Sequence, residues 1–97
     1  MKVQWSATAL NDFDQSIAYI AERNPAAAER VAGAIDRAAR ELARFQTGRP
    51  GRVSGTYEKP LPGLPYIVAY AIDRSDSIII LRVIHGARDW PPGRWPQ

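Results

Sequence analysis

The sequence predicts an α+β fold in which one strand, two helices and three further strands follow each other in a single domain, residues 1–97. Three observations lead to this prediction. Apolar residues spaced three and four positions apart indicate amphipathic helices within residues 10–45. Two runs rich in aliphatic and aromatic residues, 66–73 and 77–85, are typical of strands. The length and the 45% of hydrophobic residues suit one domain with one core.

The first two elements are predicted to be a short strand and an amphipathic helix. Lys2–Trp5 alternates polar and apolar residues, as strands do. Ser6 belongs to the residue types that cap helices, and the helix that follows it should end near Asn24. We expect its apolar stripe, facing the core, to consist of Leu10, Phe13, Ile17 and Ile20.

A second helix is predicted from Pro25 to Phe45. Asn24 is a favourable N-cap, and proline is well tolerated in the first helical turn because its missing N–H would have no helical partner there. Since the connection is short, the two helices must form an antiparallel hairpin, packed on one face of the sheet and leaving the other face available for function. The inner face of this helix is expected to comprise Val31, Ile35, Ala38, Leu42 and Phe45.

The rest of the chain predicts a small, mainly antiparallel sheet. Residues 46–55 form a connector rich in glycine, proline and arginine, and nearby prolines confine the weak strand 56–61 to an edge or a strand end. Strands 66–73 and 77–85 are joined by a tight turn and are apolar on both sides, which indicates central positions. Strict alternation along the last strand puts Arg82 on one face and His85 on the other. By the same alternation, Ile80 lies on the face of Arg82, and Val83 on the face of His85.

The formal net charge is +3, and the excess lies entirely in the second half of the chain. Residues 1–48 carry six basic and six acidic side chains, whereas residues 49–97 carry seven basic and four acidic ones. Eleven of the thirteen basic residues are arginine, whose planar guanidinium binds carboxylate or phosphate through two hydrogen bonds. This composition suits an anionic partner, either nucleic acid or an acidic protein, although codon usage explains it equally well.

Several kinds of site are excluded by what the sequence lacks. Without cysteine there is no disulfide and no thiolate metal site. A single histidine, with no glycine-rich phosphate loop and no HExxH motif, gives no basis for a metal or cofactor site. The longest apolar runs are too short to span a bilayer, and the N-terminus has no signal-peptide h-region. We therefore expect a cytoplasmic domain without cofactor, metal or membrane contact.

Residues 81–90 hold the most distinctive group of polar and aromatic side chains. His85 is the only histidine, and imidazole suits proton transfer near neutral pH. It could equally be a strand-end residue bonded to backbone, or a partner contact, and Asp89 is its one nearby acidic partner. Arg82 lies among isoleucines and must reach a sheet edge, a carboxylate or a ligand, because a buried unpaired charge is costly. Trp90 is either an interface anchor or part of a lid over the core.

Other charged residues offer weaker signals. Glu58, on the weak edge strand, is a possible acid or base. Arg49 and Arg52 lie in the glycine-bearing connector and are plausible phosphate contacts. Arg88 could form a surface pair with Asp89, worth less than about 1 kcal/mol, or belong to a binding surface. None of these residues by itself identifies a function.

Three segments have a telling order and spacing: GRPGRVSGTYE (48–58), LPYIVAYAID (64–73) and IIILRVIHGARDW (78–90). Together with the opening strand and helix pair, they resemble the RelE/ParE superfamily of toxins from bacterial type II toxin–antitoxin modules, over essentially the full length. The resemblance implies a small cytoplasmic toxin, neutralised by an antitoxin that is encoded alongside it. The extended and helical C-terminal segment of that antitoxin would wrap around the toxin.

The resemblance implies one of two activities. RelE-branch members are metal-independent ribonucleases that cleave mRNA on the ribosome, whereas ParE-type members bind and poison DNA gyrase. Ribonuclease members usually carry an arginine where this chain has Ile67, and several carry a tyrosine where it has Gly86. Both departures favour a ParE-like gyrase inhibitor, which is not an enzyme. Tyr57 stands where ParE-like sequences often have arginine, so a non-toxic member that binds only its antitoxin stays an alternative.

Site residues follow from each alternative. For a ParE-like toxin we expect Arg82, His85 and Arg88 to form a target-binding patch near the open end of the sheet, with Trp90 beside it. For a ribonuclease, Glu58, Arg82, His85 and Arg88 would have to supply the base, the proton donor and the positive charge that RNA cleavage needs.

Overall fold

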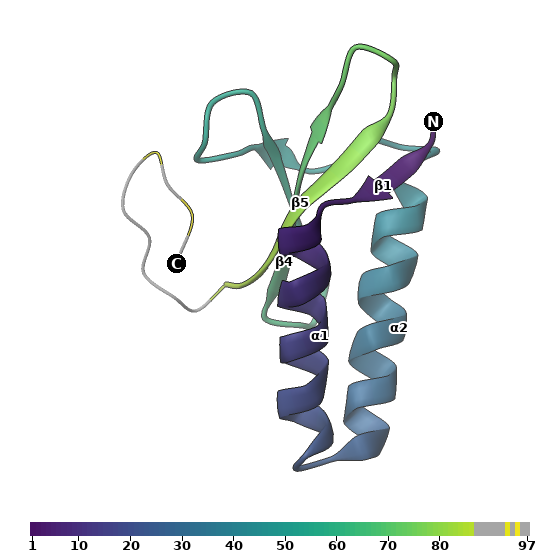
Figure 1. Cartoon of the computed structure of the whole chain (residues 1–97), viewed down its shortest axis with the longest axis vertical. Coiled ribbons are helices and arrows are strands. Elements are labelled where there is room, and N and C mark those ends of the chain that lie inside the picture. Colours follow the sequence, from purple (N-terminus) through teal and green to yellow (C-terminus); the bar gives the residue numbers. More distant parts are fainter. Residues whose placement is uncertain (87–92, 94, 96–97) are drawn as a thin grey trace.

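In the computed structural model, which describes residues 1–86, 93 and 95, a helix hairpin lies on one face of a five-stranded sheet (Figure 1). The predicted α+β architecture is confirmed, with strands in the order β1-β5-β4-β3-β2 across the sheet. Within the described residues, neither helix is long and apolar enough to cross a membrane. In chain order the elements are β1 (Val3–Trp5), α1 (Ala7–Ala21), α2 (Pro25–Glu41), β2 (Arg49–Pro50), β3 (Tyr57–Pro60), β4 (Tyr66–Ile72) and β5 (Ile78–His85).

The strands with the longest apolar runs lie at the centre of the sheet. β4 pairs antiparallel with both β5 and β3, while β1 pairs in parallel with β5 at one edge. This arrangement confirms the central position of β4 and β5 and the mainly antiparallel sheet. β2 is a correction, because Arg49–Pro50 lies within the predicted connector and yet pairs with β3 as a fifth strand. A strand of two residues is too short to give a periodic signal.

Both helices begin at the predicted caps. The Ser6 hydroxyl accepts a hydrogen bond from the Ala9 amide at 3.0 Å, and the Asn24 side chain accepts one from the Ala27 amide at 3.1 Å. Each bond satisfies an amide that has no partner within its helix. Ser6 also donates its hydroxyl proton to the Leu81 carbonyl at 3.1 Å, which ties the start of α1 to β5.

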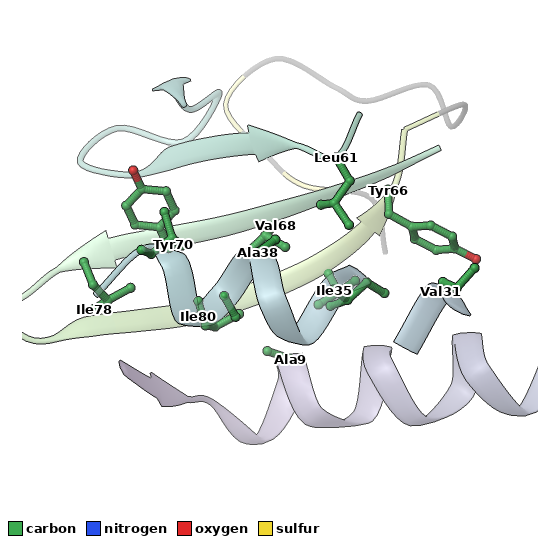
Figure 2. Packing of buried hydrophobic residues seen from close by; sticks show 13 residues of the cluster. Ala9, Val31, Ile35, Ala38, Leu61, Tyr66, Val68, Tyr70, Ile78 and Ile80 are labelled. Carbon is green, nitrogen blue, oxygen red and sulfur yellow. The ribbon is translucent and has the colours of Figure 1, made fainter. Parts of the chain in front are cut away.

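The helices face the sheet through a compact apolar core (Figure 2). Two predicted core residues are wrong. Leu10 is 48% exposed, because this turn of α1 directs Ala9 into the core instead. Phe45 is 62% exposed, because α2 ends at Glu41, four residues earlier. The other predicted residues of the two stripes are buried or pack against the core: Phe13, Ile17, Ile20, Val31, Ile35, Ala38 and Leu42.

A β-bulge breaks the alternation of β5. The register between β4 and β5 shifts at Ala69/Tyr70, so that Leu81 is an extra residue without a partner in the ladder. A shift by one residue moves the following side chains to the other face. Ile80 and Val83 therefore both join the helix-side core, and the expectation that they lie on opposite faces is wrong.

The sheet face away from the helices is not bare. Ile67, Ala69 and Ile84 are only 7%, 0% and 4% exposed, although none of them belongs to the helix-side core. The prediction that this face is available for function therefore does not hold where these three residues lie.

The turn between β4 and β5 is held by Asp73. Its carboxylate accepts hydrogen bonds from the hydroxyl of Ser75 at 2.7 Å, the amide of Ser77 at 3.0 Å and the amide of Ser75 at 2.9 Å. These bonds favour the ionised form and hold the pKa of Asp73 below its ordinary value, with the Ser75 hydroxyl as the largest cause. The turn lies at the far end of the hairpin from His85.

Candidate functional site

Arg82 reaches a carboxylate, which is one of the three possibilities that its apolar surroundings left. Its Nε donates to Asp12 Oδ2 at 2.8 Å and its Nη2 donates to Asp12 Oδ1 at 3.2 Å. The Val83 amide donates to the same Oδ2 at 3.0 Å. Because the two side chains are only 24% and 13% exposed, this two-bonded ion pair fastens α1 to the bulged part of β5.

His85 is the last residue of β5, as predicted for a strand-end position. It pairs with Tyr66 across the ladder, and the two rings meet edge to face with centroids 5.4 Å apart. Arg82 and His85 also line one small hollow of about 90 Å³ beside Ser16 of α1. The structure thus brings these two members of the predicted patch together, on the side of the sheet that α1 covers.

Arg88 and Trp90, the other two members of the patch, lie outside the described residues. The same holds for Asp89, the expected partner of His85. The target-binding patch therefore stays a prediction, and only Arg82 and His85 of its four members lie within the described residues.

Glu58 is 1% exposed and lies on the face of β3 away from the helices. Its neighbour Tyr57 stacks on the core residue Tyr70, with 5.5 Å between the ring centroids, and therefore lies on the helix side of the sheet. Because successive side chains of a strand point to opposite faces, Glu58 points to the other side. Its Oε2 accepts from the Arg52 amide at 2.9 Å, and Arg49 Nη2 lies 3.6 Å from its Oε1. Glu58 is thus engaged with the loop that follows β2.

The residues of the ribonuclease alternative are not gathered at one place. Glu58 pairs with Ala69 on the outer face of the sheet, whereas His85 pairs with Tyr66, whose side chain belongs to the helix-side core. Ile67 and Val68 of β4 lie between these two partners, and the two groups are on opposite faces of the sheet. A carboxylate and an imidazole placed in this way cannot act on the same phosphate.

Arg49 and Arg52, the predicted phosphate contacts, flank the same buried carboxylate. The Arg49 side chain is 55% exposed, and Glu58 orients its guanidinium. The backbone amide of Arg52 is held by Glu58 as well. Contact of either side chain with phosphate stays a prediction.

A groove between α2 and β3 was not foreseen from the sequence. It has a volume of about 490 Å³, and Lys59 bridges it by an ion pair with Glu41 of α2, at 3.4 Å from Nζ to Oε2. The alanines of α2 could have indicated this groove in the sequence, because small side chains leave space between a helix and the neighbouring strand. Its apolar lining consists of Ala34, Ala38, Pro60, Leu61, Pro62 and Leu64, and its charged lining of Arg37, Glu41 and Lys59.

Thr47 and Gly48 also line this groove, and a hydrogen bond from the sheet fixes the backbone there. The Tyr70 hydroxyl donates to the Thr47 carbonyl at 2.6 Å. Burial, and secondly the neighbouring Tyr57, raise the pKa of Tyr70 above its ordinary value of 10.0, which favours the protonated hydroxyl that donates this bond. The backbone at Thr47, at one end of the groove, is therefore fixed in position by Tyr70.

Comparisons with known proteins agree on one family. The family model described as the ParE toxin of the type II toxin–antitoxin system parDE matches residues 3–90. A protein of Sinorhizobium fredii (strain NBRC 101917 / NGR234), named "Putative toxin Y4kP", is 40% identical over 91 residues, which cover 93% of each chain. A solved structure, "Chromosomal ParDE TA system from P. aeruginosa", shares the fold with a TM-score of 0.81 at 22% identity, covering 88% of this chain and 95% of that one.

Proposed function

Because this chain belongs to the ParE toxin family and is the toxin component of a ParDE-type system, we propose that it inhibits DNA gyrase by binding and that a cognate antitoxin neutralises it in the cytoplasm. The observation that carries the choice of binding over RNA cleavage is the separation of Glu58 from His85. RNA cleavage needs a base, a proton donor and a phosphate-stabilising cation around one phosphate. The Glu58 carboxylate is buried and bonded to the Arg52 amide, and the His85 imidazole lies on the opposite face of the sheet, so the two do not surround one phosphate. Ile67 and Gly86, which replace the arginine and tyrosine usual in ribonuclease members, also favour binding over cleavage.

The growth of bacteria tests the toxin and antitoxin parts of this proposal together. Induced expression of the chain alone is expected to stop growth, and co-expression of the antitoxin encoded beside it is expected to restore growth. Normal growth at a good yield of folded protein would contradict a toxic function and favour a member that only binds its antitoxin.

The groove between α2 and β3 supports a binding site for the antitoxin. Its floor is apolar, and Arg37 and Lys59 stand at its rim. An amphipathic segment that carries acidic side chains matches this pattern, since such a segment lays its apolar side into a groove and pairs its charges with the rim. We place a helical part of the antitoxin there.

Reversing the charge of Lys59 tests this placement. The substitution Lys59→Glu puts a second carboxylate beside Glu41 and repels an acidic segment, so we expect antitoxin affinity to fall by about 10-fold or more. Because the Lys59 side chain is only 15% exposed and the new carboxylate repels Glu41, thermal unfolding of the variant is measured first, and its antitoxin binding is compared on folded protein. Arg23→Glu, which reverses an exposed charge near the start of α2, is the matched control. Equal binding of the antitoxin by Lys59→Glu and the unaltered chain, measured by calorimetry, would exclude the groove.

A further inference from the structure

The exposed side of α2 carries a row of four arginines. This arginine row consists of Arg30, Arg37, Arg40 and Arg44, all of them exposed residues. Arg30, Arg37 and Arg44 are seven positions apart, which is about two helical turns, so they follow one line along the helix. Arg44 lies in the turn that continues α2, where its amide donates to the Glu41 carbonyl at 3.0 Å.

The C-terminal part of the arginine row surrounds a hollow of about 230 Å³. Arg37, Arg40 and Arg44 line it together with Glu41, whose carboxylate is 3.4 Å from the ammonium group of Lys59. α2 forms one border of the molecule, and among the described elements none covers its side away from α1 (Figure 1). A large partner can therefore reach the arginine row along its whole length.

Most of the charge of the arginine row is not neutralised within the described part of the chain. Arg40 pairs with Asp36 at 2.9 Å, but the two side chains are 71% and 53% exposed, so solvent screens this pair. Among the residues that the structure describes, Arg30, Arg37 and Arg44 have no ion pair. The positive potential of these three side chains is available to an anionic partner.

The helix dipole accounts for only part of the arginine row. Its effect is confined to the last turn, where it favours Arg40 and Arg44. Arg30 lies in the first half of α2 and Arg37 before the last turn, so neither cation gains from the dipole. Codon usage can favour arginine over lysine, but it does not place arginines on one side of a helix.

Gly33 leaves room for the arginine row to lie close to the helix backbone. A Cβ at this position would be 3.2 Å from Nη1 of Arg37, so the guanidinium lies over the glycine. After proline, glycine is the least favourable residue in the interior of a helix, so this position lowers the helix propensity of α2. In return, a phosphate group of a partner can approach the backbone of α2 closely.

The composition of this surface favours nucleic acid over protein. Protein interfaces have an apolar core from which charged residues are depleted, whereas DNA-binding surfaces are polar and strongly positive. The hollow is lined only by arginines and Glu41. Phe45, which follows the arginine row, has the Arg44 guanidinium over its ring at 5.6 Å from the centroid.

Among nucleic acids, the arginine row fits duplex DNA best. Single strands are bound largely by stacking of bases on aromatic side chains, and α2 carries no aromatic residue. A straight helix suits a stiff duplex with regularly spaced phosphates. The wide major groove of B-DNA admits a helix, whereas the deep and narrow major groove of duplex RNA does not.

We propose that the arginine row binds the phosphate backbone of duplex DNA without reading its sequence. Arginine donates two hydrogen bonds to a phosphate, and contacts to phosphate carry no sequence information. This activity is separate from gyrase inhibition and from antitoxin binding, since only Arg37 also lines the groove between α2 and β3.

Fluorescence anisotropy of a short labelled DNA duplex, titrated with the full chain at several salt concentrations, tests the proposal. We expect saturable binding whose association constant falls linearly with salt on logarithmic axes, with a slope of about −2.7 to −3.6 for three or four neutralised phosphates. Absence of saturable binding at about 50 mM salt would overturn the proposal. Tighter binding to single-stranded DNA, to duplex RNA or to a polyglutamate peptide would overturn it as well.

Single-charge variants locate the binding surface. Arg30→Gln and Arg44→Gln should each make the slope less steep by about 0.9 and weaken binding by about 3-fold or more at low salt. Arg74→Gln removes the same charge from the exposed turn between β4 and β5 and should leave the slope unchanged. Thermal unfolding of the three variants is measured first, and all should be as stable as the unaltered chain because the side chains are exposed.

Equal slopes for the three variants would show that net charge alone attracts the DNA and would refute the arginine row as its site. Gyrase and antitoxin are absent from these measurements. A failure here is therefore distinguishable from a failure of the proposed function.

Discussion

Replacement of Asp12 by alanine is expected to lower the free energy of unfolding by about 3 kcal/mol or more. The Asp12 carboxylate accepts three hydrogen bonds, two from Arg82 and one from the Val83 amide, at a place that is largely shielded from water. Its loss removes two hydrogen bonds from the Arg82 guanidinium and takes the acceptor of the Val83 amide away beneath α1. Removal of one partner of a shielded ion pair costs more than the pair itself contributes, because the remaining charge stays poorly solvated.

Urea unfolding of three variants checks this expectation. Asp14→Ala changes an exposed carboxylate on the same helix and should stay within about 0.5 kcal/mol of the unaltered chain. The double variant Asp12→Ala with Arg82→Met should recover a large part of the loss, since an apolar pair needs no acceptor. If Asp12→Ala and Asp14→Ala unfold at the same urea concentration, the ion pair does not fasten α1 to β5.

Replacement of Glu58 by alanine is expected to cost about 2 kcal/mol and to loosen the loop after β2. The Glu58 side chain is 1% exposed and bonds the Arg52 amide at 2.9 Å, so truncation leaves that amide without its partner and opens a cavity under the loop. The Arg49 guanidinium, 3.6 Å from the carboxylate, loses its anchor as well. Hydrogen exchange at Arg52 should therefore accelerate more than exchange in the helices.

Two further variants separate the hydrogen bond from the charge of Glu58. Glu58→Gln keeps an oxygen acceptor for the Arg52 amide and should cost about half as much as alanine. Arg49→Ala removes a 55% exposed side chain and should cost less than about 1 kcal/mol. A Glu58→Ala variant with unchanged stability and unchanged exchange at Arg52 would show that the carboxylate does not organise the loop.

The helical half of the fold could be predicted because its signals are local. Ser6 and Asn24 cap their helices through bonds that span three residues, and Pro25 stands in the first turn of α2. The central strands were equally evident from their apolar runs. Leu10 and Phe45 were assigned wrongly because the three-and-four spacing identifies a stripe but not where the helix ends or which edge of the stripe meets the sheet.

The missed parts of the sheet depend on contacts between distant residues. The bulge at Leu81 lies where Ser6 and Asp12 of the N-terminal half bond to β5, and no local pattern shows such bonds. β2 depends on Gly48, which has a φ of +120° and lies so close to β3 that a Cβ would be 2.6 Å from the Glu58 carbonyl oxygen. In the sequence this glycine was indistinguishable from the others of a flexible connector.

The candidate site was predictable only in part, for a related reason. That Arg82 would have to reach a sheet edge, a carboxylate or a ligand followed from its apolar neighbours. Which of the three it is did not follow, because the carboxylate is that of Asp12, 70 residues away. That Glu58 would be buried and turned away from His85 did not follow, because alternation alone cannot say which face of β3 the loop covers. The groove between α2 and β3 combines a helix with a strand end, so it exists only in the folded chain.

Supercoiling of relaxed plasmid DNA by purified gyrase tests the central claim most directly. The folded chain, added in increasing amounts, is expected to inhibit supercoiling in a dose-dependent manner, and prior mixing with its antitoxin is expected to relieve the inhibition. The Lys59→Glu variant should still inhibit but should escape that relief. Undisturbed supercoiling at a large excess of folded protein, together with cleavage of mRNA on ribosomes, would contradict the account and favour the ribonuclease alternative.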